Sequence, residues 1–158
     1  MNLYIKQKLF SWGDKFSVYD RDGNEKYFVK GEVFSLGKRL HVFNTAGNEV
    51  CYIQQKVFTF LPKFVIYVNG SEAATVTKEI ALFRHVYSVD GPGWSIEGDI
   101  FEHDYTITCG ENVIASVAKK WFTLGDAFEI DISYPNDELT ALATVLVIDA
   151  CIDSSNNN

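Results

Sequence analysis

The chain has 158 residues, which is the size of one ordinary domain. It is 47% hydrophobic, 15% aromatic and only 22% charged, so it can build a core and falls outside the disordered class. Its net charge of −7 excludes a general nucleic-acid-binding protein, which would need a basic surface.

Short segments rich in valine, isoleucine and aromatic residues recur along the chain and are separated by turn sequences. Asn69-Gly70 is the strongest hairpin signal, because a type I′ turn needs positive φ at both central positions. In residues 128–132 apolar and acidic side chains alternate, as in a strand with one buried face. The pattern predicts a mainly β protein. The predicted strands are 3–9, 15–19, 26–34, 39–43, 49–57, 63–68, 72–78, 83–88, 94–100, 104–108, 112–121 and 127–132.

One sequence pattern occurs three times, with a lysine eight residues before a phenylalanine in each copy. Each copy predicts a strand, a turn and a returning strand. A hairpin present three times suits a closed sheet, in which equivalent positions meet equivalent neighbours and no edge stays exposed. The lysine and phenylalanine pairs are Lys8 and Phe16, Lys56 and Phe64, and Lys120 and Phe128.

The C-terminal segment differs from the strands, because 11 of the 14 residues from Leu139 to Ile152 are apolar and no polar stripe runs along it. A transmembrane span needs about 20 apolar residues, a buried strand usually has roughly 4–8, and a helix apolar on all sides must be surrounded. We favour a buried helix over 137–152. A helix of that length, about 24 Å, matches the height of a barrel whose strands have about seven residues. We therefore predict a closed antiparallel barrel of about twelve strands that encloses this helix.

Five segments stand out by their order and spacing, namely residues 4–16, 30–37, 55–58, 119–122 and 126–132. Together they resemble the LURP-one-related family, which lies within the tubby C-terminal-like and phospholipid scramblase superfamily. The resemblance covers residues 3 to about 153 and is that of a short bacterial-type member. It implies a 12-stranded barrel around a hydrophobic C-terminal helix, with membrane phospholipid docking as in tubby proteins or calcium-linked lipid scrambling as in scramblases. We expect one domain over 1–153 and a polar tail at 154–158.

No catalytic or cofactor motif is present, since the chain has no GxSxG, P-loop, HExxH or CxxC pattern. The histidines and cysteines are scattered, which indicates no disulfide framework and no zinc site. We therefore expect no enzyme and no cofactor. The residues concerned are His41, His85, His103, Cys51, Cys109 and Cys151.

The repeated lysines Lys8, Lys56 and Lys120 are candidates for binding an anionic lipid head group, because they recur beside aromatic residues. The alternative is that each lysine simply faces solvent. The threefold recurrence predicts that they lie at related places on the barrel.

A second candidate site is acidic. Asp126, Glu129 and Asp131 stand where the resemblance to scramblases implies a calcium-binding segment. Calcium takes roughly six to eight oxygen ligands, whereas only Glu129 and Asp131 would share the outward face. The alternative is a solvated strand face.

Charge is distributed unevenly along the chain. Residues 1–79 hold 11 Lys or Arg and 8 Asp or Glu, whereas residues 80–158 hold 3 and 13. Such asymmetry can mark opposite electrostatic faces, but folding usually mixes charges from different segments, and we expect them to interleave.

The function that we expect is that of a non-enzymatic binding or scaffold module that engages a membrane phospholipid head group or a protein partner. The alternative is a scramblase-like, lipid-active protein with weak calcium dependence. We expect no nucleic-acid partner and no transmembrane span. Because the first residues reach lysine at position 6 without the apolar stretch of a signal peptide, we expect a cytoplasmic location, peripheral to the membrane.

Overall fold

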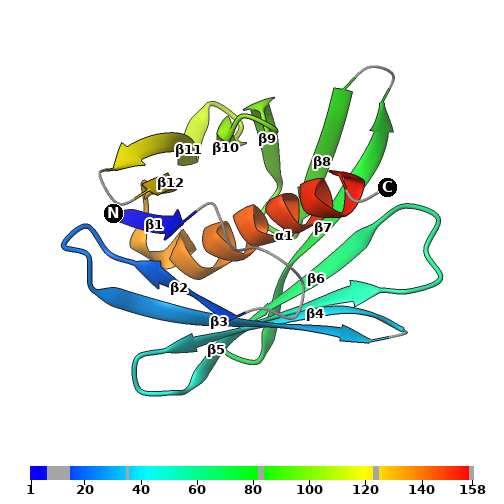
Figure 1. Ribbon diagram of the computed structural model, residues 1–158. Coiled ribbons are helices and arrows are strands. Elements are labelled where there is room, and N and C mark those ends of the chain that lie inside the picture. The colour runs from blue at the N-terminus through cyan, green and yellow to red at the C-terminus, as the bar shows by residue number, and fades with distance from the viewer. Residues whose placement is uncertain (7–14, 35, 82–83, 123–124, 157–158) are drawn as a thin grey trace.

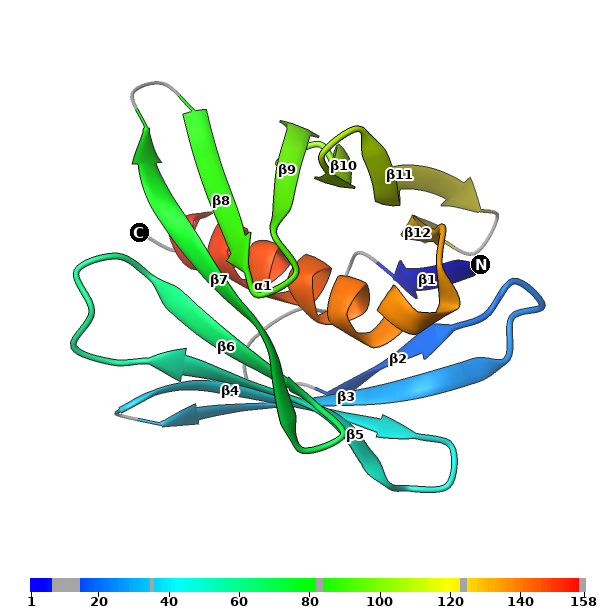
Figure 2. The same cartoon turned by 180° about the vertical axis from the view of Figure 1, so that it is seen from behind.

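The computed structural model describes residues 1–6, 15–34, 36–81, 84–122 and 125–156, with side chains except at 33–34, 80–81, 84–86, 121–122, 125–126 and 153–156. Within these ranges twelve strands form a closed antiparallel barrel, and one helix runs through its interior (Figures 1 and 2). The predicted fold class is confirmed. The elements are β1 (Asn2–Lys6), β2 (Lys15–Tyr19), β3 (Glu25–Phe34), β4 (Gly37–Asn44), β5 (Glu49–Lys56), β6 (Lys63–Val68), β7 (Ser71–Ala81), β8 (Arg84–Asp90), β9 (Trp94–Asp99), β10 (Asp104–Cys109), β11 (Asn112–Phe122), β12 (Gly125–Ile132), the 3-10 helix η2 (Pro135–Asp137) and α1 (Glu138–Asn156).

The strands follow one another round the barrel in chain order, and β12 closes it by pairing with β1. Alternation decides which face of each strand turns inward. In β12, Phe128, Ile130 and Ile132 are buried, while Glu129 and Asp131 lie on the outer face. The Asn69-Gly70 turn has the predicted positive φ at both positions, 49° and 82°.

The three repeated segments form three equivalent hairpins. Tyr4 pairs with Tyr19 in the first copy and Tyr52 with Tyr67 in the second, and a Ser116–Asp131 pair occupies the same place in the third. The repeated phenylalanines belong to the core: Phe64 and Phe128 are buried, and Phe16 is partly buried and packs against the core cluster. The repeat is thus a structural unit of the wall.

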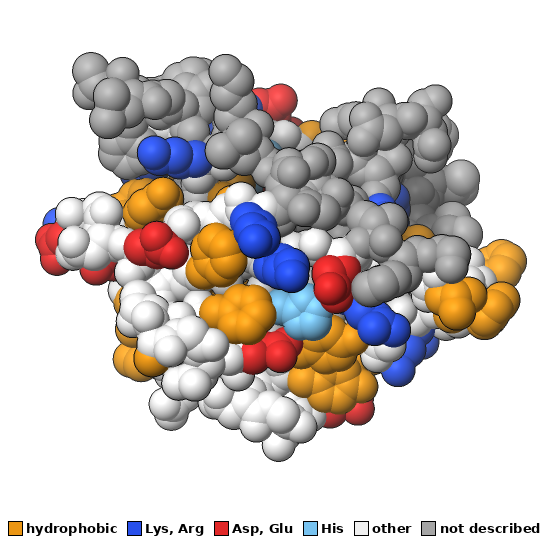
Figure 3. Space-filling view, turned by 60° about the horizontal axis from the view of Figure 1, so that its bottom comes forward, with side chains coloured by type: hydrophobic (Ala, Val, Ile, Leu, Met, Phe, Trp, Pro, Cys, Tyr) orange, Lys and Arg blue, Asp and Glu red, His pale blue; other side chains and the backbone are white. Residues whose placement is uncertain are grey.

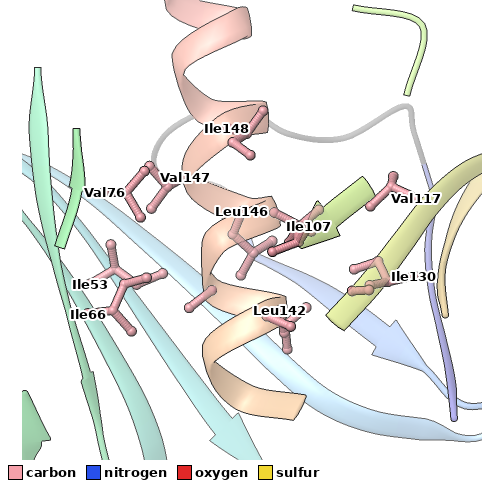
Figure 4. Packing of buried hydrophobic residues seen from close by; sticks show 14 of the residues in the cluster. Ile53, Ile66, Val76, Ile107, Val117, Ile130, Leu142, Leu146, Val147 and Ile148 are labelled. Atoms are coloured by element: carbon pink, nitrogen blue, oxygen red, sulfur yellow. The ribbon is translucent and has the colours of Figure 1, made fainter. Parts of the chain in front are cut away.

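Helix α1 is enclosed by the barrel. Side chains of β5 to β7 approach it from one side and those of β10 to β12 from the other, around Leu142, Leu146 and Ile148 (Figure 4). These three side chains are no more than 1% exposed. A helix that lacks a polar face is expected to be buried on every side. Within the described ranges, no helix combines the length and the apolar character that a bilayer-spanning segment needs.

The helix differs from the prediction at its end. It begins at Glu138 and continues to Asn156, four residues beyond the predicted end at 152 and into the segment that we expected to be a tail. Once a helix exists, each further residue adds a hydrogen bond at little cost, so a polar end can extend it.

One acidic residue in the helix has a buried partner. Asp149 accepts a hydrogen bond of 2.8 Å from Nε2 of His103, and the two side chains are 17% and 8% exposed. His103 lies between β9 and β10, and its ring stacks on Phe128 with 4.7 Å between centroids. Burial and the nearby Asp149 raise the pKa of Tyr105, which keeps this phenol neutral beside the pair. The pair explains how the helix tolerates a carboxylate.

The charges of the two halves of the chain do not interleave, contrary to our expectation. Because the strands lie in chain order, β1 to β7 form one arc of the wall, and β8 to β12 form the other. Residues 84–132 carry 9 acidic and 3 basic side chains, whereas residues 1–79 carry an excess of 3 basic ones. We call these the acidic arc and the basic arc. Exposed carboxylates of the acidic arc are Asp90, Glu97, Asp99, Glu102, Asp104 and Glu111.

We predict that Leu146→Ala lowers the free energy of unfolding by about 2–5 kcal/mol, because it leaves a cavity between the helix and the wall. Urea unfolding followed by circular dichroism measures this. Leu36→Ala, at a side chain that is 67% exposed, is the control and should change stability by less than about 0.5 kcal/mol. Equal effects of the two substitutions would contradict the enclosure of α1.

The buried pair makes a second prediction. His103→Phe should cost about 3–5 kcal/mol, because it leaves the carboxylate of Asp149 buried without its partner. Adding Asp149→Leu should recover much of that loss, since a hydrophobic pair needs no desolvated charge. A double-mutant cycle by chemical unfolding measures the coupling. His103 has a φ of 51°, and the cost of placing phenylalanine there is the same with or without Asp149→Leu, so it cancels in the cycle. If the effects of the two substitutions simply add, the pair does not stabilise the fold.

Candidate functional site

The helix occupies the interior of the barrel, so candidate binding sites lie on the outer surface of the barrel. The most unusual surface feature is the loop between β5 and β6, residues 57–62, which extends outward from the wall (Figures 1 and 2). Phe58 and Phe60 in this loop are 96% and 94% exposed. Exposed apolar side chains that form a contiguous patch often mark a surface that binds a protein, a ligand or a membrane.

Hydrogen bonds shape this loop. The hydroxyl of Thr59, between the two phenylalanines, donates to the carbonyl of Leu61 at 2.8 Å. The backbone N–H of Lys78 on β7 donates to the Pro62 carbonyl at 2.9 Å and holds the base of the loop against the sheet. Phe58 has a φ of 62°, a left-handed conformation that costs energy for a bulky residue. The loop therefore holds its phenylalanines outward in a defined shape.

A neighbouring turn enlarges the exposed apolar surface. Leu36, between β3 and β4, is 67% exposed, and Val57 is 38% exposed. The two turns lie in contact, since a Cβ built on Gly37 would come within 3.0 Å of Cγ1 of Val57. We call Leu36, Val57, Phe58 and Phe60 the apolar tip.

Two lysines stand at the base of the tip. Lys56 ends β5 and Lys63 begins β6, and the sheet register places them directly opposite each other. Among the described residues, neither takes part in an ion pair. Like charges directly opposite on a sheet repel, and an anion between them would relieve that repulsion. We call Lys56 and Lys63 the lysine pair.

The three lysines predicted from the repeat do not form one patch. Lys8 lies outside the described residues. Lys56 on β5 and Lys120 on β11 are six strands apart in a ring of twelve, on opposite sides of the barrel. Lys120 is also paired with Glu129 at 3.2 Å. The repeated hairpins are spread round the wall, and Lys56 and Lys120 are separated with them.

The acidic candidates for calcium already have protein partners. Glu129 accepts a hydrogen bond from Nδ2 of Asn2 besides its ion pair with Lys120, and Asp131 lies 3.6 Å from the terminal ammonium group of Met1. The side chain of Asp126 lies outside the described part. Among the residues whose side chains are described, no three metal-ligating groups come together. The calcium site stays a prediction without structural support.

A shallow groove of about 530 Å³ lies on the outer face of β4 to β6 and is lined by His41, Glu49, Tyr52 and Tyr67 among others. Nδ1 of His41 is 2.8 Å from Glu49, and its Nε2 is 2.8 Å from Glu32 on β3. Figure 3 shows this face, with a histidine between acidic and aromatic side chains. The hydrogen bond from His41 lowers the pKa of Glu32. Because both ring nitrogens are engaged, the histidine links β3, β4 and β5 on the outer face.

The comparisons with known proteins agree on the family. The family profile described as LURP-one-related matches residues 1–149. The uncharacterized protein YxjI of Bacillus subtilis (strain 168) is 37% identical over 149 residues, which are 94% of this chain and 92% of that protein. The chain belongs to the LURP-one-related family. The family membership predicted from the sequence is thus confirmed.

The X-ray structure of a protein from Arabidopsis thaliana has the same fold as this LURP-one-related chain. The two superpose with a TM-score of 0.63 at 18% sequence identity, over 98% of this chain and 90% of the plant protein. At that identity the likeness concerns the fold alone.

In this LURP-one-related chain the repeat pattern indicates one residue of the exposed site, Lys56, and none of the others. Lys63 lies outside the repeat pattern. Phe58 and Phe60 resemble any apolar residues near a strand end, and only their exposure distinguishes them. The spacing of the lysine pair, seven residues across a predicted turn, was the signal that could have found it.

Proposed function

We propose that the protein is a non-enzymatic module that binds anionic phospholipid head groups at a membrane surface through the lysine pair. The observation that carries the proposal is the lysine pair itself, two lysines directly opposite in the sheet register and without a carboxylate partner among the described residues. A phosphate or carboxylate group of a lipid is the kind of anion that would neutralise them.

The surroundings of the lysine pair favour a planar anionic surface. The pair belongs to the basic arc, which has an excess of basic side chains although it also carries exposed carboxylates such as Glu72 and Glu79 on β7, while the exposed carboxylates from Asp90 to Glu111 lie on the acidic arc. A charge distribution of this kind orients a molecule in the field of an anionic membrane and raises its rate of encounter. In this orientation the acidic arc, which carries much of the net charge of −7, faces away from the membrane. The negative charge therefore does not prevent contact through the basic arc.

The groove around His41 favours this function less. Its carboxylates, Glu32 and Glu49, are tied to the histidine, and they would repel an anion. No described feature favours the scramblase-like alternative, because Glu129 and Asp131 are paired with cations of the protein.

We predict that Lys56→Gln/Lys63→Gln lowers binding to phosphatidylserine-containing vesicles by at least about tenfold, because each lysine near an anionic surface contributes about 1 kcal/mol. Vesicle flotation measures bound protein, with pure phosphatidylcholine vesicles as the neutral comparison. Lys119→Gln/Lys120→Gln changes the net charge equally but lies on the acidic arc, so it is the matched control.

Binding by wild type should weaken as salt rises, since the attraction is screened. It should be the same in millimolar calcium and in EDTA, which distinguishes this function from the calcium-dependent alternative. Equal loss of binding in the two double variants would overturn the role of the lysine pair.

A further inference from the structure

We infer that the apolar tip inserts into the interfacial layer of an anionic bilayer while the lysine pair contacts its head groups. This inference rests on the proposed function and deepens it, because it names a bilayer, rather than a free head group, as the ligand. It assigns a role to Phe58 and Phe60, which the binding of a soluble anion would leave in water.

The arrangement of the loop supports insertion. The phenylalanines stand at the turn of the hairpin, and the lysines stand at its base, where the two strands begin to pair. A shallowly inserted segment places apolar side chains about 5–10 Å deep, at the boundary between head groups and acyl chains. Lys56 and Lys63, at the base of the same loop, would then lie closer to the water, at the level of the lipid phosphates, where their charge is neutralised.

The shape of the loop reduces the cost of insertion. The hydroxyl of Thr59 is bonded to the Leu61 carbonyl at 2.8 Å, so the most polar side chain of the turn is satisfied internally. The contact of Lys78 with Pro62 fixes the base of the loop to β7. A loop that is already ordered loses little conformational freedom on binding, and more of its apolar contact contributes to affinity.

The neighbouring turn widens the surface that enters the bilayer. Leu36 is carried by a separate hairpin, β3 to β4, and Gly37 next to it lies close to Val57, so the two turns are neighbours on the surface. The φ of Gly37 is 124°, in a region that L side chains rarely adopt, so this close approach depends on glycine.

A second copy of the chain is the competing occupant of the apolar tip. The tip is small, and the lysine pair would repel the same pair of a symmetric partner, since an isologous contact brings like surfaces together. An anionic bilayer is complementary to both the apolar and the basic parts, which is why we commit to it.

The test compares three double variants of the full chain by flotation on phosphatidylserine–phosphatidylcholine vesicles. Phe58→Ser/Phe60→Ser should reduce binding at least about tenfold, because burying one phenylalanine is worth roughly tenfold or more in an equilibrium constant. Val113→Ser/Tyr134→Ser removes two other side chains that are 44% and 48% exposed and should leave binding unchanged. Lys56→Gln/Lys63→Gln reports on the head-group contact separately.

A second readout places the tip in the bilayer. In Phe60→Trp, the tryptophan emission gained over wild type should shift to shorter wavelength with vesicles and be quenched by lipids brominated on their acyl chains. Thermal unfolding of the Phe58 and Phe60 variants without vesicles should match wild type, since these side chains are almost fully exposed. Lys56→Gln/Lys63→Gln should be at least as stable as wild type, because it removes a like-charge repulsion.

The outcomes separate the two proposals. If the lysine variant loses binding while the phenylalanine variant binds like wild type and the added tryptophan is not quenched, head-group binding stands and insertion is overturned. If wild type does not float at all, the proposed function fails as well. If wild type dimerises in gel filtration and Phe58→Ser/Phe60→Ser abolishes the dimer, a second copy covers the tip and the inference is wrong.

Discussion

The structure depends on one constraint, which is that the helix α1 has no polar face and must be surrounded. A helix of this kind can be stable in water only if other elements cover its whole circumference. Twelve strands closed into a ring do so, and closure also removes the exposed edges that an open sheet would present. The single carboxylate in the middle of this contact, Asp149, is retained because His103 reaches it from the wall.

Because the helix fills the barrel, the interior has no room for a ligand, and the proposed binding surface lies on the outer wall. The same sequential strand order that closes the wall keeps the basic and acidic halves of the chain apart. The hairpin that carries Phe58 and Phe60 lies on the basic arc, so apolar and positive surface coincide at one place. That coincidence is what an anionic membrane requires of a protein that binds it reversibly.

Most of the fold could be predicted from the sequence, because alternation along strands and uniform apolarity along residues 139–152 are local signals. The Asn69-Gly70 turn was found for the same reason. The site could not be predicted in this way. Lys56 lies opposite Lys63 and far from Lys120, because β5 pairs with β6 and stands across the barrel from β11. The threefold repeat carries no information about which strands are neighbours in the closed sheet. The exposure of Phe58 and the partner of Asp149 likewise depend on contacts between distant segments.

Hydrogen exchange with mass spectrometry, with and without phosphatidylserine-containing vesicles, tests the account most directly. A filled barrel that binds by its surface should keep its slowest-exchanging amides in α1, unchanged by vesicles, and should gain protection in residues 56–63. Faster exchange in residues 142–150 on addition of vesicles would show that the helix leaves the barrel, and it would contradict both the permanent enclosure of α1 and a site on the outer wall.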